Sequence, residues 1–377
     1  MTIDALLDQI DGEAAEHLSG QSEGTLMVGI TRDGERHIRR YRSEGAQLVE
    51  LPSDDSIYEI GSVSKVYCAT VLASLLNDGL LSLDDTVASH LPSGARFSPD
   101  IAKITVRDIV THTAGIPSVG RIHQGYISEE TRGQTQPPLG YTTHYLRYRK
   151  EHLYEDWTNL ALDYPTGEQW NYSVISMGTV GHILELVTGQ TFEELLIERV
   201  CKPLGVVDTR YELAEDQQER MVRAYVKEGL MAPNWYHDVL MPQGGLRSTI
   251  QDMLTFAEAN IEAGRGKDES PLGQAMKLAR TPVRTAPRFF NPFNKGDVIQ
   301  QLAWRGLEKR PNASEHGGVT LFYQAGLAVD DDTRTGVVML TSSHDNMGDV
   351  MAGMVTPDDY TSIGTRFLDW FDRACSL

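Results

Sequence analysis

The sequence predicts a mixed α/β (α+β) protein, with a mostly antiparallel sheet flanked by N- and C-terminal helices and an inserted, mainly helical region. Three observations lead to this prediction. Segments of β character with hairpin signals occur at both ends of the 377-residue chain, helical periodicity occurs at both termini, and helix starts and stops dominate the middle. Consecutive hairpins favour antiparallel pairing, and amphipathic terminal helices are expected to cover one face of such a sheet.

The N-terminal part supplies a helix, a hairpin and a strand in that order. Residues 3–18 have apolar residues at helical spacing, residues 24–31 are rich in β-branched and aliphatic side chains, and Asp33-Gly34 is a hairpin signal before a return strand at residues 36–41. A short strand at residues 56–60 then leads through Gly61 into an apolar helix that ends near Gly79.

The middle of the chain is mainly helical. Thr105-x-x-Asp108 and Thr191-x-x-Glu194 are capping boxes, and a helix from residue 173 to residue 187 is closed by Gly189. We expect residues 118–164 to form a long irregular loop that walls the site. This loop is rich in aromatic residues, namely Tyr126, Tyr141, Tyr145, Tyr148, Tyr154 and Trp157.

The C-terminal part returns to strands. A cap at Ser248-x-x-Gln251 begins a helix that ends at Gly264, residues 301–308 alternate like a strand, and residues 320–329 and 337–341 form a hairpin. A final helix contains Ile363, Phe367 and Trp370. We therefore divide the chain into an α/β sheet region, residues 1–80 plus 236–377, and a helical insertion, residues 81–235, with the active site in the groove between them.

Composition narrows the classes of function. The net charge of −19 argues against nucleic-acid and anionic membrane partners, which require a basic surface, and no apolar run reaches the length of a membrane-spanning helix. The three cysteines match no metal or disulfide pattern, and no metal-ligand spacing occurs among the histidines. The first residues lack the character of a signal peptide, so we expect a cytoplasmic protein unless an export signal precedes the printed sequence.

Ser62-x-x-Lys65 carries the first chemical signal. Residues three apart lie on one face of a helix, so the Ser62 hydroxyl and the Lys65 amine can act as nucleophile and base. Two further stretches complete a pattern: Tyr172 comes at the start of an apolar helix, and Glu315-His316-Gly317-Gly318 precedes an apolar strand where the backbone can approach a ligand.

In this order, the three stretches resemble those of the serine β-lactamase and penicillin-binding-protein superfamily. The closest likeness is to its class C-like branch, which includes family VIII carboxylesterases and D-aminopeptidases. The resemblance runs from about residue 24 to residue 341. Flanking segments support it: Thr111-His112-Thr113-Ala114-Gly115-Ile116-Pro117, Pro203-Leu204-Gly205 with Asp208-Thr209, and Gly244-Gly245-Leu246-x-Ser248-Thr249-x-x-Asp252.

The resemblance implies specific roles. Ser62 would be the acylated nucleophile, Lys65 and Tyr172 would form the general-base pair, and the backbone N–H groups of Ser62 and Val319 would form the oxyanion hole. It also implies a β-lactamase/transpeptidase-like fold. S-x-x-K chemistry needs no histidine base, so we expect His112 to be structural and to bond its own turn.

Two departures bear on the substrate. Where β-lactamases and DD-peptidases have Tyr-x-Asn, this chain has Val174, and where β-lactamases commonly have Lys-Thr-Gly, it has His316-Gly317-Gly318. A permanent cation for a substrate carboxylate is thereby replaced by a pH-dependent one. We therefore assign Val174, His316, Gly317 and Gly318 to substrate binding and favour a carboxylic esterase.

Four alternatives stay open: a D-amino-acid peptidase or amidase, a weak β-lactamase, an acyltransferase to an alcohol or amine, and a non-catalytic binding module. The expected partner is a small-molecule acyl ester or amide. We expect no cofactor, no metal, no nucleic acid and no membrane partner. The natural substrate, the acyl length and the oligomeric state do not follow from the sequence.

Overall fold

The structure is a computed structural model. It describes residues 2–19, 23–44, 47–51, 53–92, 96–131, 143–226, 230–231, 234–291, 296–320, 322–342 and 363–377. Within these ranges, no helix combines the length and the apolar character that crossing a bilayer would require. Tyr141, which the sequence assigned to the aromatic insertion, lies outside the described residues.

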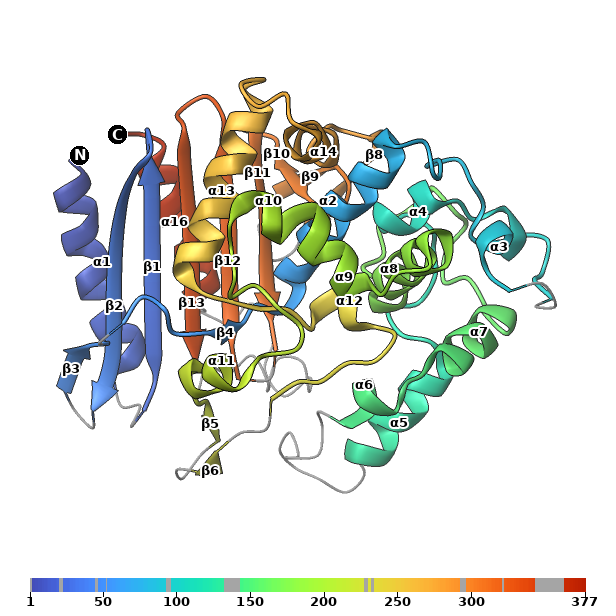
Figure 1. Cartoon of the computed structure of the whole chain (residues 1–377), viewed down its shortest axis with the longest axis horizontal. Helices are drawn as coiled ribbons and strands as arrows, with labels where there is room; N and C mark the ends of the chain where they lie inside the picture. Colours follow the sequence, from blue (N-terminus) through green and yellow to red (C-terminus); the bar gives the residue numbers. More distant parts are fainter. Residues whose placement is uncertain are drawn as a thin grey trace.

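A nine-stranded sheet forms the centre of the described molecule (Figure 1). Its strand order is β3-β2-β1-β13-β12-β11-β10-β9-β8, and every neighbouring pair is antiparallel. The antiparallel sheet with helices on it confirms the predicted fold class. The strands are β1 Thr25–Arg32, β2 Glu35–Glu44, β3 Gln47–Glu50, β8 Arg284–Asn291, β9 Gly296–Gln300, β10 Arg305–Leu307, β11 Arg310–Val319, β12 Gln324–Asp330 and β13 Thr335–Ser342.

The two ends of the chain meet in this sheet. Strand β1 pairs with β2 on one side and with β13 on the other, so that Thr25 lies opposite Ser342 and Arg32 lies opposite Thr335. The turn between β1 and β2 has positive φ at both central residues, 51° at Asp33 and 83° at Gly34. Such angles suit a tight hairpin, and they confirm the hairpin predicted at Asp33-Gly34.

The terminal helices cover one face of the sheet, as predicted. Helices α1 (Ile3–Leu18) and α16 (Ile363–Ala374) pack on each other, and the termini lie close together in Figure 1. The Trp370 indole donates a hydrogen bond to Glu13 across this contact at 2.5 Å. The buried apolar residues between the helices and the sheet include Leu6, Leu7, Ile10, Leu26, Val28, Ile30, Val337, Met339, Phe367, Trp370 and Phe371.

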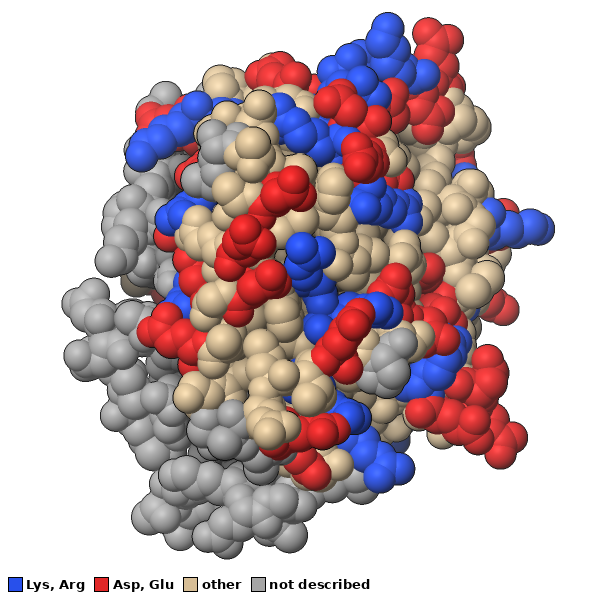
Figure 2. Space-filling model, turned by 90° about the vertical axis from the view of Figure 1, so that its left-hand side faces the viewer, with Lys and Arg blue, Asp and Glu red and all other residues tan. Residues whose placement is uncertain are grey.

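The sheet end beside these helices carries both signs of charge, as Figure 2 shows for the described residues. Strand β2 is rich in arginine, and each of these arginines meets a carboxylate. The pairs are Arg36 with Glu258, Arg39 with Asp11, Arg40 with Asp54 and with Glu50, and Arg42 with Glu44. The positive charge of the strand is therefore balanced locally.

Helices α13 (Ile250–Gly264), α14 (Pro271–Ala279) and α2 (Ser64–Asn77) form the layer on the opposite face. Gly29 of β1 admits α13, because a β-carbon there would lie 2.9 Å from Leu254. The sequence placed the cap of α13 at Ser248, which is wrong by one position. The Thr249 side chain accepts the hydrogen bond from the Asp252 N–H instead.

The middle of the chain is helical, and the capping boxes at Thr105 and Thr191 are confirmed. Its helices are α3 Val87–His90, η2 Ile101–Lys103, α4 Val106–Val110, α5 Arg121–Thr131, α6 Thr143–Arg147, α7 Lys150–Thr158, α8 Val174–Thr188, α9 Phe192–Leu196, η3 Ile197–Cys201, α10 Lys202–Leu204, α11 Glu215–Arg220 and α12 Met241–Gly244. Short pairs β4–β7 (Tyr58–Glu59, Arg247–Ser248) and β5–β6 (Tyr225–Val226, Leu230–Met231) complete the fold.

The irregular loop predicted for residues 118–164 is wrong in its described parts, which hold α5, α6 and α7. Tertiary hydrogen bonds hold α7 in place. The Tyr148 hydroxyl donates to Asp156 at 2.8 Å, and the Trp157 indole donates to Thr179 of α8 at 2.8 Å. Short helices gain most of their stability from such packing, which local sequence patterns do not reveal.

Candidate active site

Ser62 lies in a turn that contacts strands β11 and β12 of the sheet and helices α2 and α12. Strand β4 pairs with β7, and Gly61 then turns the chain with a φ of 48° into the single 3-10 turn η1, Gly61–Val63. Helix α2 begins directly after this turn, at Ser64. The sequence placed Ser62 at a helix start, and the structure places it in the turn that leads into the helix, with its side chain partly exposed.

Lys65 occupies the first turn of α2 and is completely buried. Its Nζ lies 3.0 Å from the Ser62 Oγ, 2.6 Å from the Gln243 carbonyl oxygen and 3.1 Å from the Gln243 Oε1. Burial lowers the pKa of Lys65 below its usual range, because charge on the amine is costly away from water, and nearby Tyr172 opposes part of this shift. The site therefore shifts the equilibrium towards the neutral amine, the form that can accept a proton.

Tyr172 approaches Ser62 from the start of helix α8. Its hydroxyl donates a hydrogen bond to the Ser62 Oγ at 2.7 Å, and the Lys65 Nζ lies 4.8 Å from the centre of its ring. Ser173 caps the helix by accepting a bond from the Ser176 N–H, which sets the position of the preceding tyrosine. The three residues from the first two sequence motifs are thus brought together around one oxygen atom.

His112 supports this arrangement from behind. The prediction that it bonds its own turn is wrong, because its Nδ1 accepts from the Ser173 N–H at 3.3 Å and its ring packs 4.7 Å from the Tyr172 ring. The residue has a positive φ of 57°, and its carbonyl accepts from the Asn171 N–H at 2.8 Å. Burial lowers the pKa of His112 to about 3, so the imidazole is neutral at neutral pH.

The end of strand β11 lies directly against η1. A β-carbon at Gly318 would lie 2.0 Å from the Ile60 carbonyl oxygen and 2.9 Å from the Ser62 nitrogen, so only glycine permits this approach. Val319 lies opposite Gln324 in β12, while the next pair is hydrogen-bonded through Thr320 N–H and the Tyr323 carbonyl. Alternation along an antiparallel ladder then directs the Val319 N–H away from β12. Gly61 of η1 lies against this residue, because a β-carbon at Gly61 would lie 2.7 Å from the Val319 nitrogen.

His316 and its glycines lie within β11 rather than before a strand, contrary to the sequence interpretation. His316 is buried, and its Nδ1–H donates to the Gly317 carbonyl at 2.6 Å. Burial, with Arg305 and Lys65 nearby, lowers the pKa of His316 well below its usual value. The expected pH-dependent cation is therefore disfavoured at neutral pH, because burial and the neighbouring Arg305 and Lys65 oppose the imidazolium form.

The neighbouring strand contributes a cation whose charge is already paired. Arg305 of β10 lies opposite Glu315, and its Nη2 is 2.8 Å from the Glu315 carboxylate, which is buried. Val174, the first residue of α8, is half-buried and apolar. Gln243 of α12 is the site residue that the sequence interpretation missed. No spacing or motif identified it, since its contact with Lys65 joins residues 178 positions apart.

The aromatic residues of the insertion have structural contacts of their own. Tyr145 packs 4.2 Å from His237 and 4.9 Å from Trp235, and Tyr154 bonds the His182 ring at 2.6 Å. Tyr148 is buried and bonded to Asp156. The expectation that some of these residues line an acyl pocket stays a prediction.

Comparison with known proteins identifies the family. The sequence profile of the family described as "Beta-lactamase" matches residues 5–354. The chain belongs to the beta-lactamase family. Among curated relatives, a D-alanyl-D-alanine-carboxypeptidase/endopeptidase of Escherichia coli, AmpH, is 25% identical over 66% of this chain and 60% of its own length. A beta-lactamase of Pseudomonas fluorescens is 25% identical over 73% of this chain and 70% of its own length.

Solved structures confirm the predicted fold, which matches that of class C beta-lactamases. A class C beta-lactamase superposes with a TM-score of 0.73 at 18% identity, covering 99% of this chain and 98% of that protein. A beta-lactamase/D-alanine carboxypeptidase from Pseudomonas syringae superposes with a TM-score of 0.69 at 21% identity, covering 93% and 97%. The match to AmpH spans less than two thirds of that relative's length.

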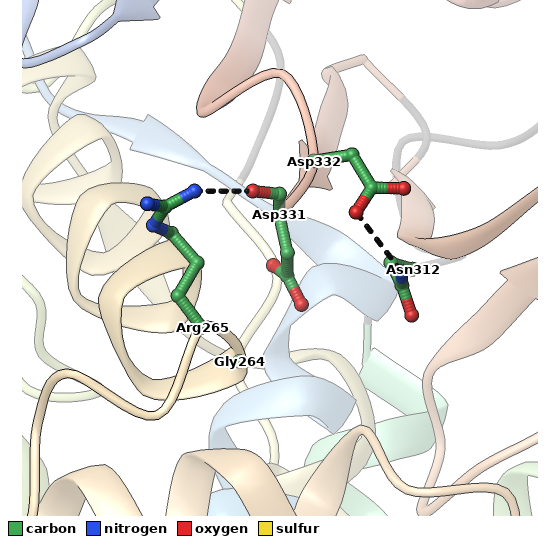
Figure 3. A pocket seen from close by; sticks show the side chains of 5 residues that line it. All are labelled: Gly264, Arg265, Asn312, Asp331 and Asp332. Carbon is green, nitrogen blue, oxygen red and sulfur yellow. Dashed lines mark hydrogen bonds between the residues drawn. The ribbon is translucent and has the colours of Figure 1, made fainter.

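A surface depression of about 300 Å³ lies elsewhere, between the end of α13 and the turn that joins β12 to β13 (Figure 3). Arg265 donates to the Asp331 carbonyl at 3.0 Å, and Asn312 donates to the Asp332 carboxylate at 3.0 Å. Beneath this surface, the buried Arg280 donates to the Asp331 carboxylate at 2.8 Å. The residues that line the depression do not include Ser62, Lys65, Tyr172 or Gln243.

Proposed function

We propose that the protein is a serine hydrolase that forms an acyl-enzyme on Ser62 and acts on carboxylic esters. One observation carries the proposal: the Ser62 Oγ lies within hydrogen-bond distance of both the Tyr172 hydroxyl, at 2.7 Å, and the Lys65 amine, at 3.0 Å. A hydroxyl so placed can release its proton to a positioned base as it attacks a carbonyl carbon.

The proposed reaction has two halves. The Ser62 Oγ bonds to the ester carbonyl carbon, its proton passes to the Lys65–Tyr172 pair, and the oxyanion is bound by the N–H groups of Ser62 and Val319. Collapse breaks the bond to the alcohol oxygen, which leaves with the proton. Water then attacks the acyl-enzyme, gives up a proton to the same pair and releases the carboxylic acid, and the proton returns to Ser62.

The preference for neutral esters rests on the charges around Ser62. His316 is neutral at neutral pH, the nearby Arg305 is paired with Glu315, and Val174 offers no amide to a peptide carbonyl. A substrate carboxylate would therefore lose its hydration without an unpaired cation among these residues in exchange. The main competing hypothesis is that the substrate bears a carboxylate, because relatives are named as beta-lactamases and carboxypeptidases.

Covalent labelling tests the reaction class. A fluorophosphonate probe should modify Ser62 in the parent protein, and intact-mass spectrometry should show one adduct that Ser62→Ala lacks. An unmodified parent would contradict the proposal and favour a non-catalytic binding module. A Ser62→Ala variant that keeps full esterase activity would also contradict it and would place the reaction at another residue.

A substrate panel tests the preference. Neutral p-nitrophenyl esters should give a higher kcat/KM than nitrocefin or D-alanyl peptides, both of which carry a carboxylate. The opposite ranking would assign the site to β-lactam or peptide chemistry. Adding an alcohol or amine acceptor measures acyl transfer directly, because diverted product identifies an acyltransferase.

A further inference from the structure

We infer that Gln243 is a positioning residue, and that its two oxygen atoms orient the Lys65 amine so that the amine faces the Ser62 hydroxyl. The inference rests on the proposed role of Ser62 and Lys65. It starts from the observation that the Lys65 Nζ makes two hydrogen bonds to one residue, at 2.6 Å to the Gln243 carbonyl and at 3.1 Å to its Oε1.

The count of donors explains why two oxygens matter. A neutral amine has two N–H donors and one lone pair. If both N–H groups point to Gln243, the lone pair points to the third neighbour, the Ser62 Oγ at 3.0 Å. When Ser62 gives up its proton, the O–H bond breaks, a third N–H bond forms on Lys65, and all three contacts persist. The same heavy-atom geometry thus accommodates both protonation states.

The fold holds Gln243 rigidly in this position. Gln243 is 3% exposed and lies in α12, which packs on α8 through two glycines. A β-carbon at Gly178 would lie 2.2 Å from the Leu240 side chain, and one at Gly181 would lie 2.1 Å from Pro242. Since Tyr172 immediately precedes the cap of α8, this single contact fixes the tyrosine and the lysine acceptor relative to each other.

Gln243 also introduces no charge. A carboxylate in its place would stabilise the ammonium form of Lys65, whereas an amide oxygen accepts the hydrogen bond without this penalty to the neutral amine. The titratable or charged groups that interact electrostatically with Lys65 come from several surrounding elements. They are Tyr172, Cys68 of α2, His112, His316 of β11 and Arg305 of β10.

Two substitutions of nearly equal size separate orientation from charge. Gln243→Met removes the Oε1 acceptor and keeps the backbone oxygen, while Gln243→Glu keeps an acceptor and adds a carboxylate. The readout is the pH dependence of Ser62 modification by a fluorophosphonate. A matched control is Gln217→Met. Gln217 is a buried glutamine of α11, and its side chain donates hydrogen bonds to the Val207 carbonyl and to Asp208.

Opposite shifts are expected. Gln243→Met should slow modification by at least about tenfold at its plateau, since a positioned base contributes on the order of 10²–10⁴ in rate. It should also move the acidic limb to lower pH, because the ammonium loses an acceptor, whereas Gln243→Glu should move that limb to higher pH. Gln217→Met should do neither. If Gln243 had only a structural role, both variants would lower the folded fraction. They would not shift the acidic limb of the pH profile in opposite directions.

A spectroscopic titration makes the test independent of turnover. The ¹³C shift of the Lys65 ε-carbon, assigned with Lys65→Arg, should titrate at lower pH in Gln243→Met and at higher pH in Gln243→Glu. Unshifted titrations and unchanged labelling rates in both variants would overturn the role of Gln243. Failure of the parent to label at Ser62, with shifted titrations, would instead overturn the proposed function alone.

Discussion

Lys65 and Arg280 are both buried basic side chains, and the protein surrounds them with different kinds of acceptor. Arg280 donates to the Asp331 carboxylate at 2.8 Å and to the carbonyls of Asn260 and Asn312 at 2.8 and 3.0 Å. Lys65 bonds a hydroxyl, a carbonyl and an amide oxygen, and none of its hydrogen bonds within the described ranges goes to a carboxylate.

The difference separates a structural group from a reactive one. A buried guanidinium beside a carboxylate keeps its charge and connects α14 to the β12–β13 turn. A buried amine among neutral oxygens loses the stabilisation of its charged form, so its pKa falls. Burial alone therefore does not indicate reactivity, and the chemistry of the acceptors decides it.

The largest expected effect comes from removing the nucleophile. Ser62→Ala should lower kcat/KM for a p-nitrophenyl ester by about 10⁴–10⁶-fold, since loss of a nucleophile in comparable hydrolases has effects of that order. The folded structure should be unaffected because the side chain is small and partly exposed. Residual turnover within tenfold of the parent would place the reaction at another residue.

Lys65→Met should separate activity from stability. Loss of the base should lower kcat/KM by about 10²–10⁴-fold. Because the pKa of Lys65 is lower in the folded chain than in the unfolded chain, the unfolded state binds more protons between the two pKa values. Burial of the amine therefore costs stability at neutral pH, below the unfolded value. Thermal unfolding at pH 7 should therefore show a higher Tm for Lys65→Met, and an unchanged or lower Tm would contradict this reading.

Asp331→Asn tests the contrasting site around Arg280, and it should lower stability where Lys65→Met raises it. It leaves Arg280 buried with neutral acceptors and should lower the free energy of unfolding by about 1–3 kcal/mol. Esterase activity under native conditions should match that of the parent. A loss of activity without a loss of stability, measured by urea unfolding and by steady-state kinetics, would show that the two regions are coupled.

The last prediction concerns His123 of α5, a buried imidazole that burial keeps in its neutral form. Among the described residues, neither of its ring nitrogens has a hydrogen-bond partner, and burial lowers its pKa from 6.5 to about 3. Below about pH 6.5 the unfolded chain gains a proton that the folded chain refuses, so stability falls as pH decreases towards about 3, by about 1.4 kcal/mol per pH unit. His123→Phe should make this decline shallower in urea unfolding at pH 7 and pH 4, and parallel slopes would exclude the effect.

The sequence by itself determined the elements whose signals are local. The amphipathic terminal helices, the Asp33-Gly34 hairpin and the capping boxes at Thr105 and Thr191 depend on residues within a few positions of one another, and each is confirmed. The order of the three motifs also pointed to the family that the comparisons show. The helices at residues 121–158 were missed because side chains from distant elements, such as Thr179 for Trp157, stabilise them.

Only the tertiary structure decided the charges of the site. Whether His316 is a cation depends on how deeply β11 buries it and on the proximity of Arg305 and Lys65, which no spacing encodes. The orientation of His112 towards α8 and the contact between Gln243 and Lys65 likewise join segments separated by 61 and 178 positions. A nucleophile can be read from neighbours in sequence, whereas the protonation state of its base depends on what the fold packs around it.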